Sequence, residues 1–519
     1  MQNVIKIEKP TRCTLTTKTL IDLIATTKAE AVRRSGVLPL GISDHNLVYA
    51  TLKITSKRPP PKVIRVRNFR QFNKNNFKAE MEQTAFHVAS IFEDKDDVLW
   101  AWGLLFKGVC DNHAPYKNVK VRSLSAPWIS NTIRLKMNRR FKLFKKAVDS
   151  KNTEDWANYK ILRNEITSDI RKAKAAYFQA KLDEVKTSGA YWNLLNNATK
   201  PKAAKSIGPL KRENESLAVD DKEKANLINT FFSSVGEKLA RSVEPLPFRP
   251  IIKVAVPCLS DIPLSCSIIE KKLSLLKTSK ATGPDGISQR LLKLAGPSVT
   301  APPTNLFLRS MEQGVYEDWK IARLNPVFKK DDETEIGNYR PISLLSVPSK
   351  ILESCVADAL TKHVLLDNHL VTNNQWTYRK GYSTELLLAH LTETWRRAID
   401  SKQVVGVVLI DFQKVFDSVS QTIPSIHKLK HNFRIDGYLL DWLMDYLSNR
   451  KQLCTDYAQV TYGIPQGSVL GPTLFNLYTS DLPDSATSGE VYMYADDTTI
   501  YCMGNTIDHV TTLLKSSFA

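Results

Sequence analysis

Two apolar segments that end in carboxylates constrain the fold of this chain more than any other feature. Residues 404–412, VVGVVLIDF, are apolar and β-branched up to one acid, Asp411, and predict a strand. Residues 490–503, EVYMYADDTTIYCM, predict two strands joined as a hairpin at Asp496 and Asp497. Carboxylates beside apolar strands are costly unless a cation compensates their charge. Two Mg²⁺ ions about 3.5–4 Å apart are the usual solution in nucleotidyl transfer.

A glycine-rich segment between these acids predicts a shaped loop. Residues 462–472, YGIPQGSVLGP, hold three glycines and two prolines, and an apolar helix follows from Phe475. Glycine lets the backbone approach a ligand closely, and proline fixes its path. Taken alone, the segment could be an ordinary entry to a helix, and two Asp residues are common in turns for local reasons.

The net charge narrows the class of partner. Among 519 residues, 73 are Lys or Arg and 53 are Asp or Glu, which gives a net charge of +20. Such an excess favours nucleic acid or an anionic membrane surface, although scattered charge on a basic soluble protein would give the same total. The apolar share of 42% supports real cores, and the length predicts two to four units.

The expected cellular location of the protein and the redox state of its cysteines rest on signals that the sequence does not contain. It has no apolar run of about 18 residues, so we expect no transmembrane helix. No targeting signal is recognisable at the N-terminus. The seven cysteines form no CxxC pair, which supports neither a zinc site nor a disulfide framework. We therefore expect a reducing intracellular location, in the nucleus and/or the cytoplasm.

Much of the positive charge lies in residues 117–186, which hold 18 Lys or Arg and 7 acids, a surplus of 11. Apolar residues recur there at steps of three and four, which predicts helices over 133–146 and 154–182. Aromatic residues are interspersed with the basic ones, and this mixture suits phosphates and stacked bases. An ordinary amphipathic helix pair with solvated lysines is the alternative. The residues that carry the pattern are Ile133, Met137, Phe141, Phe144, Trp156, Tyr159 and Tyr177.

Proline-rich stretches and a helix cap elsewhere in the sequence predict the domain organisation. A proline-rich break at Ser56–Pro61 predicts a linker. Asp220 or Asp221 can cap a helix, and a stretch dotted with prolines covers about 243–263. From Leu264 onward, helix and strand signals alternate in an α+β pattern.

Three segments resemble, in their order along the chain, the palm of reverse transcriptases: LIDFQKVFDSV, GIPQGSVLGPTLFNLYTSDLP and YADDTTIY. They are most similar to the palms of non-LTR (LINE-type, jockey-like) retrotransposons. TGPDGIS, WKIARLNPVFKK, NYRPISLLS and NQWTYRKGYST resemble the fingers of that family. PWIS and NTFFSSV resemble the linker that precedes its polymerase, and IDLIATT and GISDHNLVYA resemble the end of its apurinic-type endonuclease.

The resemblance implies an α+β fold: right-hand polymerase fingers and palm with an antiparallel palm sheet over 264–519, with the thumb missing. It further implies a basic, largely helical linker region over 57–263. Residues 1–56 would be the C-terminal remnant of an α/β endonuclease domain, so the chain would be truncated at both ends.

The resemblance also implies roles for individual residues. Asp411 and Asp496 would bind two Mg²⁺ ions, which Mn²⁺ can replace, with Asp497 beside them. Phe416 would exclude a 2′-hydroxyl and so select dNTPs, although it could also be a core residue. Nucleotide contacts would come from further residues: Gln466, Gly467, Arg340, Lys329 and Lys330. Arg340 could instead form a structural ion pair. The partners would be an RNA template, a DNA primer or target and dNTPs, with no membrane.

In the endonuclease remnant, Asp44 and His45 match the terminal Asp-His pair of the family. In that family the Asp orients an imidazole that assists phosphodiester hydrolysis. Most of that domain would be missing, so we expect no nuclease activity.

Some residues depart from the family pattern. Val415 stands where Ala is usual, and residues 375–378 read QWTY in place of Gln-Phe-Gly-Phe. The interval from Arg450-Lys451-Gln452 to Gly463 looks too short for a strand pair, which predicts a small deletion in the palm. The hypotheses are therefore an RNA-directed DNA polymerase or, alternatively, a catalytically dead remnant that binds nucleic acid. An RNA-dependent RNA polymerase is disfavoured by Phe416.

Overall fold

The computed structural model describes residues 4–5, 7–13, 17–26, 31–38, 45–52, 62–121, 126–150, 152–185, 188–199, 207–241, 256–419 and 423–517. These fall into two compact units, residues 1–65 with 118–186, and residues 66–117 with 187–519. The units divide the chain differently from the predicted ranges 1–56, 57–263 and 264–519, because parts of 57–263 fold with the C-terminal half. The predicted linker at Ser56–Pro61 lies outside the described residues.

The first unit contains short strands and two long helices. β5 and β6 form its longest strand pair and run antiparallel from Val32 opposite Leu52 to Leu38 opposite Leu47. The bounds of its elements are β1 Val4–Ile5, β2 Arg12–Cys13, β3 Lys18–Thr19, β4 Ala25–Thr26, β5 Val32–Leu38, β6 Leu47–Leu52, α3 Asn131–Ser150 and α4 Thr153–Asp183. β7 Lys62–Arg67 and β8 Tyr116–Val121 form a separate two-stranded sheet.

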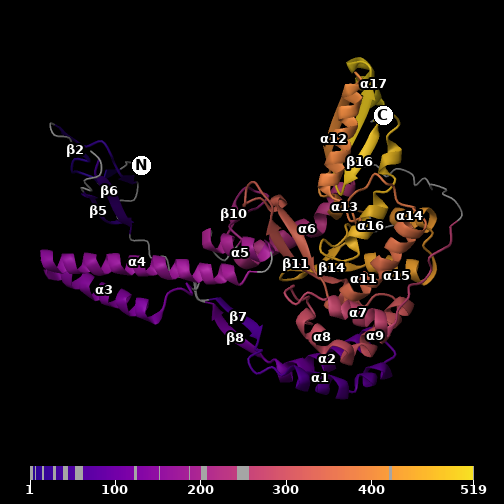
Figure 1. Ribbon diagram of the computed structural model, residues 1–519, viewed down its shortest axis with the longest axis horizontal. Helices are drawn as coiled ribbons and strands as arrows, with labels where there is room; N and C mark the ends of the chain where they lie inside the picture. Colours follow the sequence, from indigo (N-terminus) through magenta and orange to yellow (C-terminus); the bar gives the residue numbers. More distant parts are fainter. Residues whose placement is uncertain are drawn as a thin grey trace. The chain divides into compact units, whose positions relative to one another are not determined.

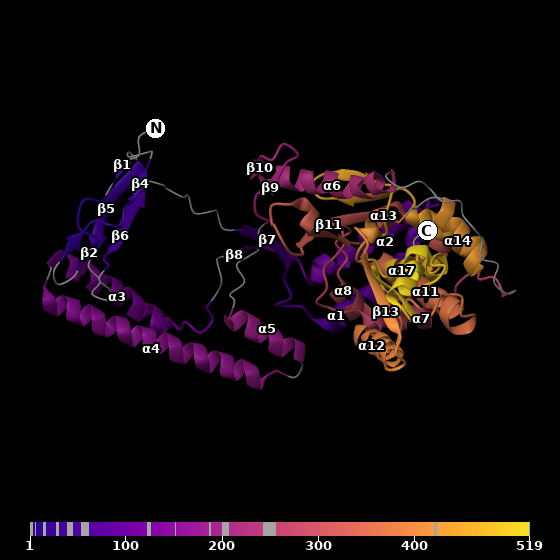
Figure 2. The same cartoon turned by 90° about the horizontal axis from the view of Figure 1, so that it is seen from above.

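Helices α3 and α4 form an antiparallel hairpin, which confirms the two predicted helices (Figures 1 and 2). Ile133 of α3 and Ile166 of α4 are buried. The ring centroids of Phe144 and Tyr159 lie 5.3 Å apart. Aromatic side chains of the predicted pattern therefore take part in the packing between the two helices, as the amphipathic alternative requires.

A large apolar core organises the second unit. Trp102, Phe106, Trp319 and Phe475 are almost fully buried in it. Residues 66–117 thus share one core with the C-terminal half, although they lie far apart in sequence. The helices around this core are α1 Lys74–Gln83, α2 Lys95–His113, α7 Cys266–Leu275, α8 Gln289–Ala295, α9 Ala301–Gln313, α10 Glu317–Lys320, α11 Val347–Thr361, α14 Ile423–Phe433, α15 Gly437–Leu447 and α16 Gly471–Tyr478.

A four-stranded sheet of order β12-β11-β14-β15 lies in the same unit. Its strands are β11 Ile321–Phe328, β12 Tyr339–Leu344, β14 Arg450–Leu453 and β15 Tyr457–Val460. The interval from Arg450 to Gly463 does hold a strand pair, because β14 and β15 form a tight antiparallel hairpin with Arg450 opposite Val460. The deletion relative to the family stays a prediction.

Helix α6, Asp221–Arg241, lies against this sheet. Its N-terminus confirms the predicted cap, since the Asp220 carboxylate accepts a hydrogen bond from the Glu223 amide at 3.0 Å. The Asn229 side chain donates to the Asp456 carbonyl at 3.0 Å, and Gln452 donates to the Asn229 carbonyl at 2.7 Å. α6 therefore belongs to the same folded unit as the sheet. Between residues 187 and 220 the same unit also contains α5 Ser188–Thr199, β9 Leu210–Lys211 and β10 Leu217–Ala218.

The second sheet of this unit is antiparallel, with order β13-β17-β16, and its strands are Val404–Asp411, Asp497–Gly504 and Glu490–Tyr494. Helix α12, Thr384–Asp400, packs on one face through Leu387 and Leu391. Helix α17, Ile507–Ser516, packs on the other face through Val510 and Leu514, close to Gly406 (Figure 1). The sheet confirms the predicted strand and hairpin. Within the described ranges, every helix is too short or too polar to cross a lipid bilayer.

Candidate active site

The three acids named from the sequence meet at one end of the antiparallel sheet. Asp411 ends β13 directly opposite Asp497, which begins β17. Residues directly opposite each other share a face of the sheet. Asp496 lies with Ala495 in the turn between β16 and β17, and the φ of Ala495 is 59°. A two-residue hairpin turn needs such a left-handed backbone to follow the twist of its strands.

The charges of these acids repel one another. Burial raises the pKa of Asp497, and the nearby carboxylates of Asp496 and Asp411 raise it further, while Lys329 lowers it. Like charges close to one another disfavour simultaneous ionisation. A bound cation would remove that repulsion, so this edge of the sheet is suited to one.

The donor set at this edge fits Mg²⁺ better than Zn²⁺. Across the described part of the chain, no three Asp, Glu, His or Cys side chains converge as a complete protein metal site. Mg²⁺ does not need such a site, because it usually binds one or two carboxylates and completes its octahedron with waters and substrate phosphates. Zn²⁺ sites usually combine carboxylates with His nitrogen or Cys sulfur, and among the described residues no His or Cys joins these acids in such a group.

The predicted glycine-rich loop connects the acid-bearing segment with β12. The Ile464 amide donates to the Phe416 carbonyl at 2.9 Å, and the Ser343 amide donates to the Gln466 carbonyl at 2.7 Å. Gly467 has a φ of 113°, and a Cβ there would lie 2.9 Å from the Ser343 carbonyl oxygen. This close approach requires glycine, which is why the loop is shaped as the sequence predicted.

The Gln466 side chain is held by a half-buried acid, Asp417. Its Nε2 donates to Oδ1 of Asp417 at 2.7 Å. Burial raises the pKa of Asp417, and the Gln466 hydrogen bond and Lys414 lower it. A cavity of about 50 Å³ adjoins both side chains. Since only the amide nitrogen of Gln466 can face a carboxylate, Asp417 determines the orientation of that amide.

Phe416 lies partly in the core and is partly exposed, so the structure is compatible with both roles considered from the sequence, a core residue and a contact to the nucleotide sugar. Its ring is half-buried and stacks on Phe475, with the centroids 4.2 Å apart and the planes inclined by 20°. One face of the ring is therefore part of the core. Its role in sugar selection stays a prediction.

The three basic residues named for triphosphate binding lie on the hairpin of β11 and β12. Arg340 is opposite Val327 in the strand register, and Lys329 follows β11 directly. Lys329, Lys330 and Arg340 are all exposed. None of them forms an ion pair with an acid in the described part of the chain, which leaves their charge available to an anion.

A buried polar residue near the acids was not singled out from the sequence. Gln375 is fully buried, and its side chain forms hydrogen bonds with Ala495 in the turn. The sequence analysis named the segment for its resemblance to the fingers and for the departure of QWTY from the family pattern, and gave Gln375 no role. A buried Gln is rare, but the sequence does not reveal burial of a single polar residue, so no local signal identified it.

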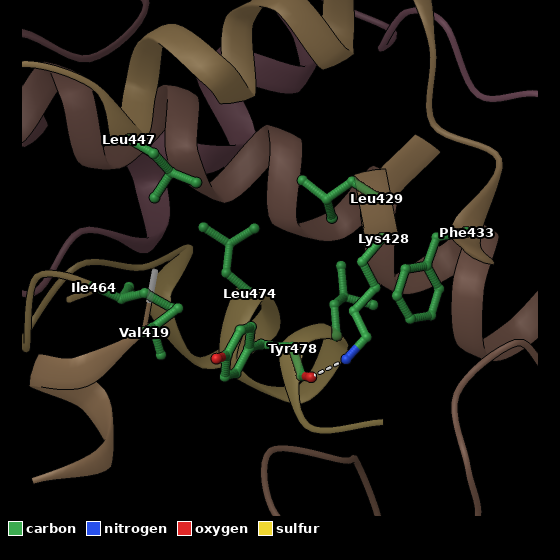
Figure 3. A pocket seen from close by; sticks show the side chains of 9 residues that line it. Val419, Lys428, Leu429, Phe433, Leu447, Ile464, Leu474 and Tyr478 are labelled. Atoms are coloured by element: carbon green, nitrogen blue, oxygen red, sulfur yellow. Dashed lines mark hydrogen bonds between the residues drawn. The ribbon is translucent and has the colours of Figure 1, made fainter. Parts of the chain in front are cut away.

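A second cavity, of about 20 Å³, lies among α14, α16 and the start of the glycine-rich loop at Ile464 (Figure 3). Its lining is apolar apart from Lys428, whose ammonium donates to the Tyr478 carbonyl and to Asp481, the latter at 2.5 Å. Burial lowers the pKa of Lys428, and Asp481 opposes that shift. The volume suits about one water molecule, so we interpret this cavity as a packing void around a tethered lysine.

In the N-terminal unit, Asp44 lies outside the described residues, whereas His45 is described and exposed. Nδ1 of His45 lies 2.9 Å from Oδ2 of Asp22. The hydrogen bond with His45 lowers the pKa of Asp22, and one with Thr11 adds to this. The carboxylate seen beside this imidazole is thus Asp22, which the sequence analysis did not name because the two residues are far apart in the chain.

Comparison with known families identifies two segments. Residues 327–517 match the family described as Reverse transcriptase (RNA-dependent DNA polymerase). Residues 129–187, which contain α3 and α4, match the Female sterile protein K10 C-terminal domain.

Several curated proteins of Drosophila melanogaster are similar to this chain. The probable RNA-directed DNA polymerase from transposon BS is 25% identical over 67% of this chain and 39% of its own length. The RNA-directed DNA polymerase from mobile element jockey is 26% identical over 54% of this chain and 31% of its own length. The corresponding protein from transposon X-element is 30% identical over 33% and 19%. The matches thus span about two fifths or less of the length of these relatives.

Proposed function

Residues 327–517 are a reverse transcriptase domain of the non-LTR retrotransposon type, and from this we propose that the chain is an RNA-directed DNA polymerase. It would extend the 3′-hydroxyl of a DNA primer with dNTPs on an RNA template. The observation that carries this function is the register of the antiparallel sheet, in which Asp411 faces Asp497 beside the turn of Asp496.

Asp411 and Asp496 would hold two Mg²⁺ ions, with Asp497 adjusting the charge beside them. When bound, the ions would activate the primer hydroxyl and stabilise the leaving pyrophosphate. The repulsion that raises the pKa of Asp497 supports this assignment, because the edge carries excess negative charge. Mn²⁺ could replace Mg²⁺, since both accept carboxylate and water oxygens.

The other residues would position the nucleotide. Lys329, Lys330 and Arg340 would bind the triphosphate, where negative charge develops in the transition state. Gln466 and Gly467 would lie along the nucleotide and the template. No covalent intermediate is required, so positioning and charge neutralisation would supply most of the rate enhancement.

Phe416 would select dNTPs by contacting the sugar where a 2′-hydroxyl would project. Its stacking on Phe475 supports this role, because a ring supported on one face cannot easily yield to an extra hydroxyl. Phe416→Ala should therefore raise the use of rNTPs relative to dNTPs. An unchanged ratio in primer extension would leave Phe416 as a core residue only.

Primer extension on an RNA template with Mg²⁺ tests the proposed activity. Asp496→Asn should abolish extension, because it removes a charged metal ligand while keeping the size of the side chain. Asp484→Asn is a matched control, since this Asp is exposed in the short 3-10 helix Leu482–Ser485 and is not part of the turn that joins β16 and β17. Extension that survives Asp496→Asn would count against the assignment.

A second candidate function is nucleic-acid binding by α3 and α4 without catalysis. The observation that favours it is the basic surplus of residues 117–186 together with exposed aromatic residues such as Phe141. RNA binding should then fall steeply with salt and survive Asp411→Ala. Binding that does not depend on salt would exclude this candidate.

A further inference from the structure

A short segment before α12 extends the antiparallel sheet as if it were a fourth strand. Gln375 forms a parallel bridge with Met493 of β16. The Met493 amide donates to the Asn374 carbonyl at 2.8 Å, and the Trp376 amide donates to the Met493 carbonyl at 2.9 Å. The Asn374 side chain donates to the Val491 carbonyl at 2.7 Å. The segment is thus fixed along β16 by main-chain and side-chain hydrogen bonds.

The side chain of Gln375 points from this segment to the turn that carries Asp496. Its Oε1 accepts hydrogen bonds from the amides of Ala495 and Thr377, both at 3.2 Å. Its Nε2 donates to the Ala495 carbonyl at 3.4 Å. One primary amide therefore pairs with both the N–H and the C=O of the residue that precedes Asp496.

Ala495 is a residue whose conformation needs such support. Its φ of 59° lies in the left-handed region, which a residue with a Cβ disfavours. Backbone of this kind persists only when the surrounding structure holds it. On the basis of the polymerase function proposed above, we propose that Gln375 is a positioning residue: it holds the Ala495 turn so that the Asp496 carboxylate stays at the edge shared with Asp411.

Simple space filling would not explain a glutamine at this position. Gln375 is completely buried, and a buried primary amide is costly unless its polar atoms are paired. A leucine or methionine would fill a similar volume without that cost. The hydrogen bonds of Gln375 to Ala495 and Thr377 offset it, and two of these three bonds end on the catalytic turn.

The expected consequence is a weaker metal site, because Asp496 is held one peptide away from the Gln375 amide. Catalytic groups must stay within about 0.5 Å of their productive positions. Gln375→Leu keeps the volume and removes all three bonds. We expect it to raise the Mg²⁺ concentration for half-maximal primer extension about tenfold, since small misplacements have large catalytic effects.

A second readout does not depend on activity. The Ala495 amide loses its acceptor in Gln375→Leu, so hydrogen exchange in a peptide covering 490–497 should become about tenfold faster. Gln375→Glu keeps an acceptor for the Ala495 amide but places an oxygen against the Ala495 carbonyl. It should raise the Mg²⁺ requirement while retaining more amide protection than Gln375→Leu.

Asn374→Ala is the matched control. It removes a side-chain hydrogen bond from the same segment to β16, but the bond ends on the Val491 carbonyl and its loss frees no backbone amide. Its Mg²⁺ requirement and its exchange in 490–497 should stay within about twofold of the wild-type protein.

The outcomes separate this inference from the proposed function. If the full chain extends primers and Gln375→Leu matches the wild-type protein in both readouts, Gln375 has no positioning role. If Asn374→Ala shifts both readouts as strongly, the effect belongs to the segment as a whole and the inference is wrong. If the wild-type chain extends no primer at all, the polymerase function fails, and hydrogen exchange still decides whether Gln375 holds the turn.

Discussion

The carboxylate edge of the antiparallel sheet and the α3–α4 hairpin present charge in opposite ways. At the edge, three acids are fixed by strand register, and Asp411 can face Asp497 in only one alignment. On the hairpin, most basic residues are spread along exposed helix faces, and only a few of them, such as Lys136, form an ion pair within it. The comparison teaches that a register-fixed site should fail abruptly when one residue changes, whereas a distributed surface should weaken gradually.

Within the hairpin, some of the charge is already neutralised. Lys136 bonds Glu165 at 2.5 Å and Asp169 at 2.7 Å, which joins the two helices. Arg139 and Arg140 form no ion pair with any acid in the described part of α3 and α4. Basic side chains without an acidic partner, such as Arg139 and Arg140, are available to bind phosphates. These are therefore the residues to substitute.

The largest expected effect is at the edge. Asp411→Ala removes a carboxylate that would bind metal, and should lower primer extension by about 10³-fold, as the loss of a charge-stabilising group in a transition state does. RNA affinity should be unchanged, because the substitution lies outside α3 and α4. Parallel measurements of extension and of equilibrium RNA binding check this. A joint loss of both would show that the two regions do not act separately.

A smaller effect is expected from the acid that orients Gln466. Asp417→Asn replaces a charged acceptor by an amide that can either donate or accept, so the orientation of the Gln466 amide is no longer fixed. The KM for dNTP should rise about tenfold with a smaller change in kcat, because uniform substrate binding is lost.

A double-mutant cycle controls for indirect effects at this position. If Asp417 acts through Gln466, Gln466→Ala alone and the double variant should have the same KM. Additive effects would contradict that link, and equal thermal stability of Asp417→Asn and the wild-type protein would exclude loss of folding.

The hairpin should respond more weakly and in proportion to charge. Changing Arg139, Arg140 and Lys142 together to Glu should lower RNA affinity about threefold to tenfold at low salt and flatten its salt dependence. The matched control changes Arg139 and Arg140 to Lys, which keeps the charge and should keep the affinity. An abrupt loss of RNA binding from one of these substitutions alone would contradict the gradual response expected of the hairpin.

Local patterns were sufficient to predict much of this architecture. The β13 strand, the β16–β17 hairpin and helices α3, α4 and α6 each have their periodicity or cap within one continuous segment. The meeting of Asp411 with Asp497 followed from the resemblance to a family, and the strand register agrees with it.

Contacts between distant segments were not predictable. Gln375 and Ala495, Asp417 and Gln466, and Asp22 and His45 are each joined by folding and not by spacing in the sequence. The shared core was not predictable for the same reason, since the burial of Trp102 with the C-terminal half depends on tertiary packing that α2 alone does not reveal. Periodicity indicates which face of an element is buried, but not which element covers it.

The smallest expected effect is a pH dependence confined to the hairpin. Hydrogen bonds from Lys146 at 2.8 Å and Ser150 at 2.7 Å lower the pKa of Asp155. A carboxyl group with a depressed pKa in the folded state adds stability above its unfolded pKa, near about 3.9, and loses it as the pH falls through the folded value. The pair therefore stabilises the α3–α4 contact at neutral pH and ceases to do so in acid.

Asp155→Asn should accordingly lower the thermal midpoint of the hairpin by only about 1–2 °C at pH 7, because Lys146 is largely exposed and solvent screens the pair. As the pH falls through the lowered pKa of Asp155, the melting temperatures of the variant and the wild-type protein should converge. Circular dichroism at 222 nm on the full chain measures both midpoints, and Asp183→Asn near the end of α4 is the control without a lysine partner. A difference that persists unchanged into acid would mean that Asp155 acts through packing and not through its charge.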